Sequence, residues 1–249
     1  KTPLGIAAAV LDRIDTLAGY FGIGVRVKGT SDPFGLRRNT LALLSLVQEE
    51  GLDLDLEDAF RSALTVYGET LSAPGAAVEA FLQFAADRLA VINREQGIPY
   101  DQVAAAIAAH GRRPVQVRRC LTALGRLNEQ HVQLLAEQTK RIQRIALDPA
   151  PAIDPALLED NEKALHALTG KPGAAVRDLV ARGAFDDAFF EVLSWMPVIE
   201  AYFEAVFVNH EDARMRQNRH ALLKAVFNAV TAVADLTLIE KKEDRKSVV

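Results

Sequence analysis

The chain has 249 residues and a formal charge of −4, which excludes a uniformly basic protein that coats nucleic acid but leaves room for a local basic patch. Apolar residues make up 49% of the sequence and aromatic residues only 6%. Ala, Leu and Val therefore supply most of the apolar surface, which favours helices over a β-sandwich or barrel. We expect an all-α protein.

The chain shows no sign of an oxidising compartment or of a membrane. Its single cysteine, Cys120, cannot form an intrachain disulfide or a cysteine-rich zinc site. No apolar run reaches the roughly 18 residues of a transmembrane helix, and the first residues lack the order of a secretory signal. We predict a cytoplasmic protein without a membrane partner. The abrupt opening of the first helical pattern suggests a fragment of a larger protein.

The first half of the chain shows apolar residues at spacings of three and four, which predict helices. We expect a connector over 21–30, where glycines interrupt a partly β-branched segment. Ser31 and Asp32 can cap a helix, and a proline suits its first position, so the next helix should begin at Pro33. The predicted helices are 4–20, 33–50, 56–67, 76–96 and 100–109.

The second half of the chain opens with a predicted long helix over about 115–147, followed by a stiff Pro-rich linker over 148–155. A domain boundary is expected just before or within that helix, around 112–130, and the linker is the competing choice. The last ten residues are charged and should fray. Further helices are predicted at 155–168, 172–182, 185–195, 197–208 and 211–236.

Motifs for catalysis or metal binding are missing from the sequence. The five histidines form no His-x-x-x-His pair, and there is no phosphate-binding glycine loop or serine nucleophile elbow. Cys120 has cationic neighbours that could lower the pKa of its thiol, but a small helix-face residue is the favoured interpretation. We predict no catalytic residue, no metal site and no cofactor within this chain.

Basic residues are the informative charges. No acid occurs among residues 112–126, which contain five arginines. If the long helix is continuous, residues 119, 126, 133 and 140 recur every seventh position and form one slowly winding stripe, with two more arginines nearby at 141 and 144. A second stripe runs along 216, 220, 224 and 228. Solvated helix faces would explain both stripes, but Arg and Asn also suit phosphates and base edges, so RNA-binding faces are the alternative.

A family resemblance rests on three stretches. "AAVLDRIDTLAGYFGIGVRVKGTSDPFGLRRNTLALL" resembles the part of the bacterial glycyl-tRNA synthetase β subunit that reads D-K-x-D-T-L, then F-x-I-G, then G-[ST]-x-D-P-[FY]-x-L-R-R. "LAEQTKRIQRIAL" resembles A-x-x-K-R-[IV]-x-N-I-L, with Arg144 where Asn is usual. "YFEAVFVNHEDARMRQNRHALL" resembles F-F-[DE]-x-V-x-V followed by R-x-N-R-L-x-L-L, with His220 where Leu is usual.

The resemblance implies a C-terminal fragment with three parts. Residues 1–25 would end an HD-like helical domain, 26–111 would form a helical body, and 112–249 would be an anticodon-binding domain of the kind found in arginyl-tRNA synthetases. The family's enzyme joins glycine to tRNA(Gly) with ATP and magnesium, as an α2β2 assembly whose active site lies on the α subunit. Asp12 resembles the last ligand of an HD metal site, but this chain has no His-Asp dipeptide to complete it.

The resemblance and the basic stripes together predict the RNA-contacting residues. Helix packing or a salt bridge is an equally open interpretation for Asn218 and Arg219. The alternative function is a helical assembly module whose basic faces contact the rest of the synthetase, and an HD-type phosphohydrolase is a third. The predicted contacts are Lys140, Arg141, Arg216, Asn218 and Arg219, with Arg112, Arg113, Arg119 and Arg126 as weaker phosphate contacts.

Overall fold

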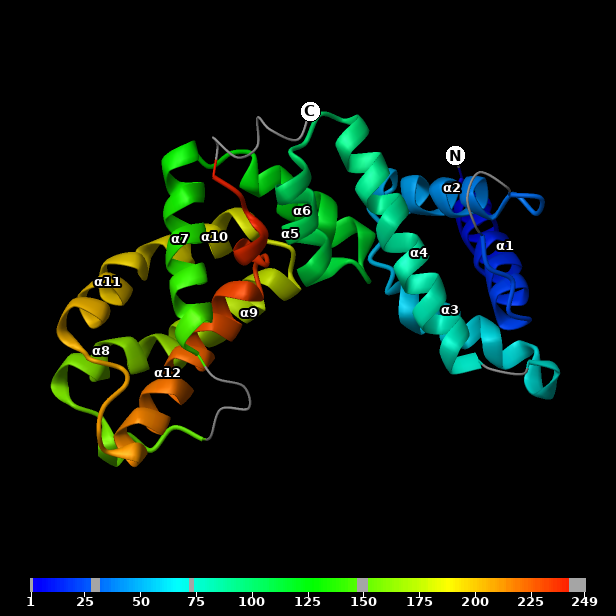
Figure 1. Cartoon of the computed structure of the whole chain (residues 1–249). Coiled ribbons are helices and arrows are strands. Elements are labelled where there is room, and N and C mark those ends of the chain that lie inside the picture. Colours follow the sequence, from blue (N-terminus) through cyan, green and yellow to red (C-terminus); the bar gives the residue numbers. More distant parts are fainter. Residues whose placement is uncertain (1, 28–31, 72–73, 147–151, 242–249) are drawn as a thin grey trace. The chain divides into compact units, whose positions relative to one another are not determined.

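The structure is a computed structural model that describes residues 2–27, 32–71, 74–146 and 152–241. Helices with short connections make up the described part, and it contains no β-strand (Figure 1). The all-α prediction is confirmed. None of the helices in the described ranges is long and apolar enough to cross a membrane. The helices are α1 (Pro3–Gly22), α2 (Leu36–Glu49), α3 (Leu56–Val66), α4 (Pro74–Glu95), α5 (Tyr100–His110), α6 (Pro114–Leu124), α7 (Glu129–Ile145), α8 (Asp160–Thr169), α9 (Lys171–Ala181), α10 (Phe185–Ser194), α11 (Met196–Ala205) and α12 (Ala213–Thr231), with short 3-10 turns at Gly68–Thr70, Pro155–Leu157 and Leu236–Leu238.

The chain divides into two compact units. Unit 1 contains residues 1–103 and 110–118, and unit 2 contains residues 104–109 and 119–249. The division therefore falls within α5 and α6, and the arginines at 112 and 113 belong to unit 1. The predicted domains over 1–25, 26–111 and 112–249 stay predictions.

Unit 1 is built around the buried face of α1. Residues at helical spacing on that face pack against α2, α3 and α4, and an aromatic cluster fills the centre. The Phe60 and Phe81 rings stack with centroids 4.1 Å apart, and Phe21 meets both of them edge-on. The buried stripe that the sequence indicated is Val10, Ile14, Leu17 and Phe21.

The second helix begins later than the sequence predicts. Asp32 does cap it, because its carboxylate accepts hydrogen bonds from the backbone N–H of Leu36 at 2.8 Å and of Arg37 at 3.0 Å. Gly35, however, has a left-handed φ of 65°, so regular helix starts only after it, and the predicted start at Pro33 is wrong. The predicted cap at Ser31 lies outside the described residues.

The predicted long helix over 115–147 is two helices. Helix α6 ends at Leu124, and α7 begins at Glu129, where the Asn128 side chain accepts a hydrogen bond from the His131 N–H at 2.8 Å. A side-chain cap satisfies an N–H group that would lack a partner at a helix start, so this sequence favours a new helix over continuation. The heptad stripe over 119, 126, 133 and 140 is therefore wrong, since its members lie on different elements.

Unit 2 is organised around α7 and α12. Helix α7 packs against α12 and α11, while α12 also contacts α8 and α9 (Figure 1). Four large aromatic side chains, each no more than 1% exposed, fill the space between these helices. Helix α7 buries one face in this core, which leaves its charged residues on the opposite side. The buried aromatic residues are Phe185, Phe189, Trp195 and Tyr202.

Candidate nucleic-acid interface

A groove of about 600 Å³ lies along the outer face of α7. Three cations of α7 line it, and residues 240 and 241 form the opposite wall. The lining holds four basic side chains and two acidic ones, in a chain whose overall charge is negative. Local positive charge of this kind attracts the phosphates of RNA. The lining residues are Gln133, Ala136, Glu137, Gln138, Lys140, Arg141, Arg144, Glu240 and Lys241.

The C-terminal wall is fixed to α7 by side-chain hydrogen bonds to the backbone. Gln133 donates its amide N–H to the Glu240 carbonyl at 3.1 Å, and the Lys140 ammonium donates to the Ile239 carbonyl. Lys241 lies 3.9 Å from the carboxylate of Glu137 across the groove. Lys140 is thus half-buried and partly committed, although an ammonium group has three N–H donors.

The other flank of the groove meets α11. The Gln138 amide donates to the Glu200 carboxylate at 3.3 Å, and the Arg141 guanidinium lies 4.1 Å from the centre of the Phe203 ring. Arg141 is exposed, so this contact leaves part of its guanidinium open to solvent. Arg144, one turn further, is exposed in the last turn of α7, where a cation is favourable for the helix dipole.

Two other predicted cations of unit 2 lie near the start of this region. Arg119 is exposed on α6, and Arg126 pairs with Asp186 at 2.6 Å in the connection that follows α6. Between them, Cys120 is fully buried and its thiol donates to the Val233 carbonyl, with 3.4 Å between sulfur and oxygen. Burial raises the pKa of the Cys120 thiol to about 12, so a small buried residue, and not a nucleophile, is what the structure supports.

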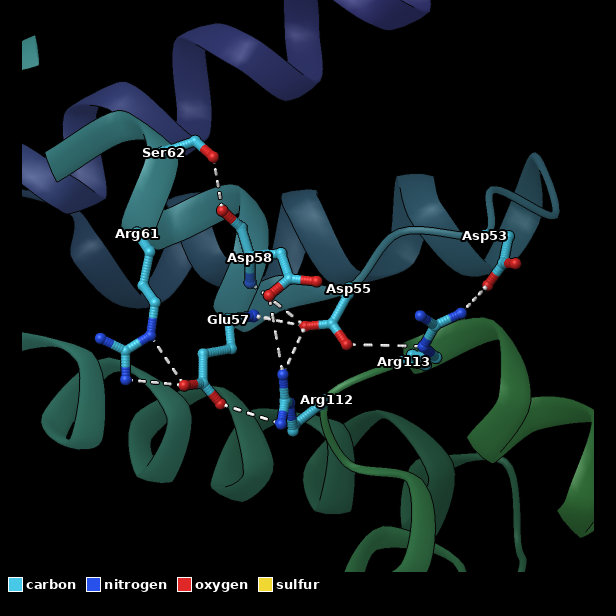
Figure 2. Close-up of polar contacts among 8 residues, drawn as sticks. All are labelled: Asp53, Asp55, Glu57, Asp58, Arg61, Ser62, Arg112 and Arg113. Carbon is cyan, nitrogen blue, oxygen red and sulfur yellow. Dashed lines mark hydrogen bonds and ion pairs between the residues drawn. The ribbon is translucent and has the colours of Figure 1, made fainter. Parts of the chain in front are cut away.

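Arg112 and Arg113 lie in unit 1 against an acidic cluster at the start of α3 (Figure 2). Arg112 meets the carboxylates of Asp55 at 3.3 Å and of Glu57 at 3.1 Å. Arg113 meets Asp53 at 3.1 Å and Asp55 at 3.4 Å. Both guanidinium groups are about half exposed, but their charge is balanced by the acids beside them. They are weaker candidates for phosphate contact than the α7 cations.

Asp55 is the centre of that cluster. Its carboxylate caps α3 by accepting hydrogen bonds from the N–H of Glu57 at 3.0 Å and of Asp58 at 3.2 Å. The Leu56 N–H donates to the Arg112 carbonyl at 2.8 Å, which holds the two segments together. Burial alone would raise the pKa of Asp55, but the cap hydrogen bonds and the charge of Arg112 outweigh it and lower the pKa.

The second predicted stripe does not form one exposed face of α12. His220 is buried, and its Nδ1 lies 2.7 Å from the carbonyl oxygen of Ile145. Arg216 is half-buried and donates to the His210 carbonyl at 2.7 Å. Because α12 runs through the core of unit 2, residues four apart on it meet different neighbours.

Asn218 and Arg219 are buried, at 4% and 3% exposed. The Asn218 amide accepts from the Asp154 N–H at 2.7 Å and donates to the Asp154 carbonyl at 3.1 Å. Arg219 donates to Glu162 at 2.6 Å, to Glu159 at 2.8 Å and to the Phe207 carbonyl at 2.8 Å. The packing and salt-bridge interpretation that the sequence left open accounts for both side chains. Their contact with RNA stays a prediction.

The predicted residues therefore separate by burial. The structure brings Lys140 and Arg141 together in the α7 groove, and it places the other predicted contacts elsewhere. The sequence analysis missed Gln138, Phe203 and Lys241 as members of this surface. The spacing of Gln138, Arg141 and Arg144 every third residue was a usable signal, because such residues share one helix face.

Comparison with known proteins identifies the family. Residues 1–108 match the family model described as glycyl-tRNA synthetase beta subunit. Proteins named glycine–tRNA ligase beta subunit are 35% identical in Ectopseudomonas mendocina over 246 residues and 33% identical in Pseudomonas putida strain KT2440 over 250 residues. The chain belongs to the glycyl-tRNA synthetase β-subunit family.

The match covers nearly all of this chain but only part of its relatives. Each of these alignments takes in 96% of the chain and 36% of the relative, as does one at 31% identity with the beta subunit of Actinobacillus pleuropneumoniae serotype 7. The chain thus spans about a third of the length of the curated relatives that it matches. The family resemblance is confirmed, and it extends over both compact units.

Asp55 generates a prediction about stability and pH. Replacing Asp55 with Asn keeps a capping oxygen but removes the charge that Arg112 and Arg113 share, which should lower the free energy of unfolding by about 1 kcal/mol at pH 7. The folded-state pKa of Asp55 is lowered, so the stabilisation by its charge is complete above the unfolded pKa, near 4, and is lost as pH falls through the folded pKa.

Urea unfolding followed by circular dichroism at pH 7, 5 and 3 measures this difference. The gap between Asp55→Asn and the unsubstituted chain should shrink on acidification, and a gap that widens would contradict the assignment. Asp53→Asn is the control, because its carboxylate is 57% exposed and pairs only with Arg113, so it should change stability by less.

Arg219 generates a second prediction. Replacing Arg219 with Met leaves the Glu162 carboxylate, which is 1% exposed, buried without its charge partner, and should lower the free energy of unfolding by about 3 to 5 kcal/mol. Arg214→Met, at an exposed position on the same helix, should cost less than about 0.5 kcal/mol. Adding Glu162→Gln to Arg219→Met should restore part of the loss. Equal urea midpoints for the two single variants would refute the role assigned to Arg219.

Proposed function

We propose that this chain is the tRNA-binding, C-terminal part of the β subunit of glycine–tRNA ligase and that it recognises the anticodon end of tRNA(Gly). The α7 groove is the observation that supports this proposal most directly, because exposed guanidinium groups gather there on a chain with net negative charge. Guanidinium groups match phosphate geometry and also stack on bases. Family membership supplies the tRNA as the ligand class.

The proposal orders the predicted contacts by their commitments within the chain. Arg141 and Arg144 come first because they are exposed at the groove, and Lys140 contributes the donors that Ile239 does not use. Arg119 is an exposed outlying cation. Arg112, Arg113 and Arg126 would have to exchange a carboxylate for a phosphate, while Arg216, Asn218 and Arg219 would have to break internal hydrogen bonds.

The proposed role is to bind and orient the tRNA, without a catalytic step on this chain. ATP, magnesium and the joining of glycine are assigned to the whole α2β2 enzyme, with the reaction on the α subunit. The cytoplasm, where tRNA is charged, is the proposed location. Asp12 is exposed on α1, and a metal role for it would require ligands from outside this chain.

Binding of tRNA(Gly) by this chain is the first measurement. We expect an affinity that falls with salt, and a weaker affinity for a tRNA(Gly) with an altered anticodon. The double variant Arg141→Ala/Arg144→Ala should reduce the slope of log K against log salt by about 1.4 to 1.8, since each lost phosphate contact removes about 0.7 to 0.9.

A matched control is available on α9. The variant Arg177→Ala/Arg182→Ala removes two exposed arginines from the same unit, outside the groove, and should leave the salt slope unchanged. Equal slopes for the two double variants would refute the groove as the phosphate-binding surface. Equal affinity for both tRNAs at physiological salt would refute anticodon recognition.

A second candidate function is assembly with the rest of the synthetase. The outer face of α1 favours it for unit 1, because Leu4 and Leu11 are 81% and 67% exposed there. Leu11 also borders an apolar groove of about 430 Å³ between α1 and the end of α2. Exposed apolar patches with a neighbouring groove are typical of protein contacts. The groove is lined by Pro3, Ile6, Ala7, Val10, Leu11, Glu50 and Leu52.

Sedimentation of the chain mixed with the α subunit tests the assembly role. If unit 1 carries the contact, a complex should form, and Leu4→Asp/Leu11→Asp should abolish it while leaving tRNA binding unchanged. Thr65→Asp/Val66→Asp, at exposed positions on α3, is the control and should preserve the complex. Sedimentation of the two proteins as separate species would exclude assembly through this chain alone.

A further inference from the structure

Two neighbouring contacts join α7 to α11 beside the basic groove. Gln138 and Arg141 lie three residues apart on α7, and their partners Glu200 and Phe203 lie three residues apart on α11. The first pair is a hydrogen bond of 3.3 Å, and the second places the guanidinium carbon 4.1 Å from the ring centre. Both helices therefore present matching faces that fix where the Arg141 side chain lies.

The support beneath Arg141 is rigid. Phe203 is half-buried and packs edge-on against Tyr202, with ring centroids 5.5 Å apart and an interplanar angle of 72°. Tyr202 is 1% exposed and belongs to the core of unit 2. A guanidinium that rests on an aromatic ring loses much of the freedom of an arginine side chain before any ligand arrives, which reduces the entropic cost of binding.

The exposed side of this guanidinium is a flat, cationic surface inside the groove. Unpaired RNA bases stack on guanidinium planes and aromatic rings, and such stacking tolerates any base because every base has a π-face. Arg144 and Lys140 lie on the same groove, where they can hold phosphates that flank a stacked base. A carboxylate ligand would use the charge of Arg141 but would gain nothing from the ring behind it.

We propose that Arg141, held on Phe203, is the stacking platform for one unpaired base of the bound tRNA. This inference rests on the proposed tRNA-binding function and adds to it a residue that contacts a base, as distinct from cations that contact phosphates. Arg141 then contributes a planar surface as well as a charge. Phe203 is a positioning residue, because it acts through Arg141.

A series of anticodon stem-loops of tRNA(Gly), each with one abasic loop nucleotide, tests the platform. For the unsubstituted chain, one loop position should lose about tenfold in affinity when its base is removed. Arg141→Lys keeps the charge but removes the plane, so it should weaken the intact loop by about the same factor. In Arg141→Lys, removal of that base should then have almost no further effect, because the two changes remove one interaction.

The salt slope separates stacking from charge. Arg141→Lys should leave the slope of log K against log salt unchanged, since it preserves the cation. Phe203→Leu should reduce the abasic effect without changing the slope, because it removes the ring that fixes Arg141. Circular dichroism of both variants verifies that the helices are intact.

The chain offers a matched control in unit 1. Arg88 lies 4.2 Å from the ring centre of Phe84, a stack like that of Arg141, but its side chain is only 18% exposed and lies 3.6 Å from Asp87. Arg88→Lys should leave both the affinity and the abasic profile unchanged. It therefore reports on the loss of an Arg–Phe stack that is not part of the groove.

The outcomes separate this inference from the function on which it rests. If the chain binds the stem-loop with salt dependence but Arg141→Lys keeps the abasic profile of the unsubstituted chain, the platform is refuted and tRNA binding stands. If the unsubstituted chain binds no tRNA, the proposed function is refuted, and the platform with it. A tenfold abasic effect that disappears only in Arg141→Lys and weakens in Phe203→Leu would support the platform.

Discussion

The buried guanidinium of Arg219 is the interaction on which unit 2 depends. Its N–H groups hold Glu162 near the start of α8, Glu159 just before it and the Phe207 carbonyl after α11, so one side chain joins three segments to α12. The charges lie where water cannot screen them, and either one left alone would be costly. Burial and the charge of Glu162 also raise the pKa of Tyr202, which keeps its hydroxyl neutral within this network. Asn218 and His220, the neighbours of Arg219, extend the same control to Asp154 and to Ile145 at the end of α7.

That arrangement positions the candidate interface without taking part in it. Helix α7 is fixed at its C-terminal end by α12 and along one face by the core, so the opposite face is presented in a defined orientation. The segment over 239–241 then closes one side of the groove through bonds from Gln133 and Lys140. Surfaces that bind nucleic acid gain from such preorganisation, because less order has to be imposed on binding. The basic residues of this chain thus act at two levels, as buried fasteners on α12 and as exposed charges on α7.

Family membership and local physics explain different parts of the chain. The family model matches residues 1–108, yet the groove lies wholly in unit 2, beyond that match. The motif around Asp32 helped to identify the family, and in the structure it caps α2 in unit 1. Arg112 and Arg113, close to the division between the units, are balanced by acids around Asp55 and serve the junction between α3 and the turn before α6. A motif can therefore identify the family without forming the surface proposed to bind the ligand.

The sequence by itself determined the helical class, most helix positions and the family, because helical periodicity, caps and ordered motifs are local properties of the chain. It also indicated Lys140 and Arg141. It did not determine where helices break when competing local signals are close in strength, as at Gly35 and Asn128. Only the tertiary structure decided which cations are available, because burial and partners depend on residues far apart in sequence. Arg219 meets acids 57 and 60 positions away and becomes a fastener, Arg112 meets Asp55 at the same separation of 57, and Arg141 meets the ring of Phe203 and stays exposed. Identical side chains acquire different roles because the free energy of a charge is set by its surroundings and not by its place in the sequence.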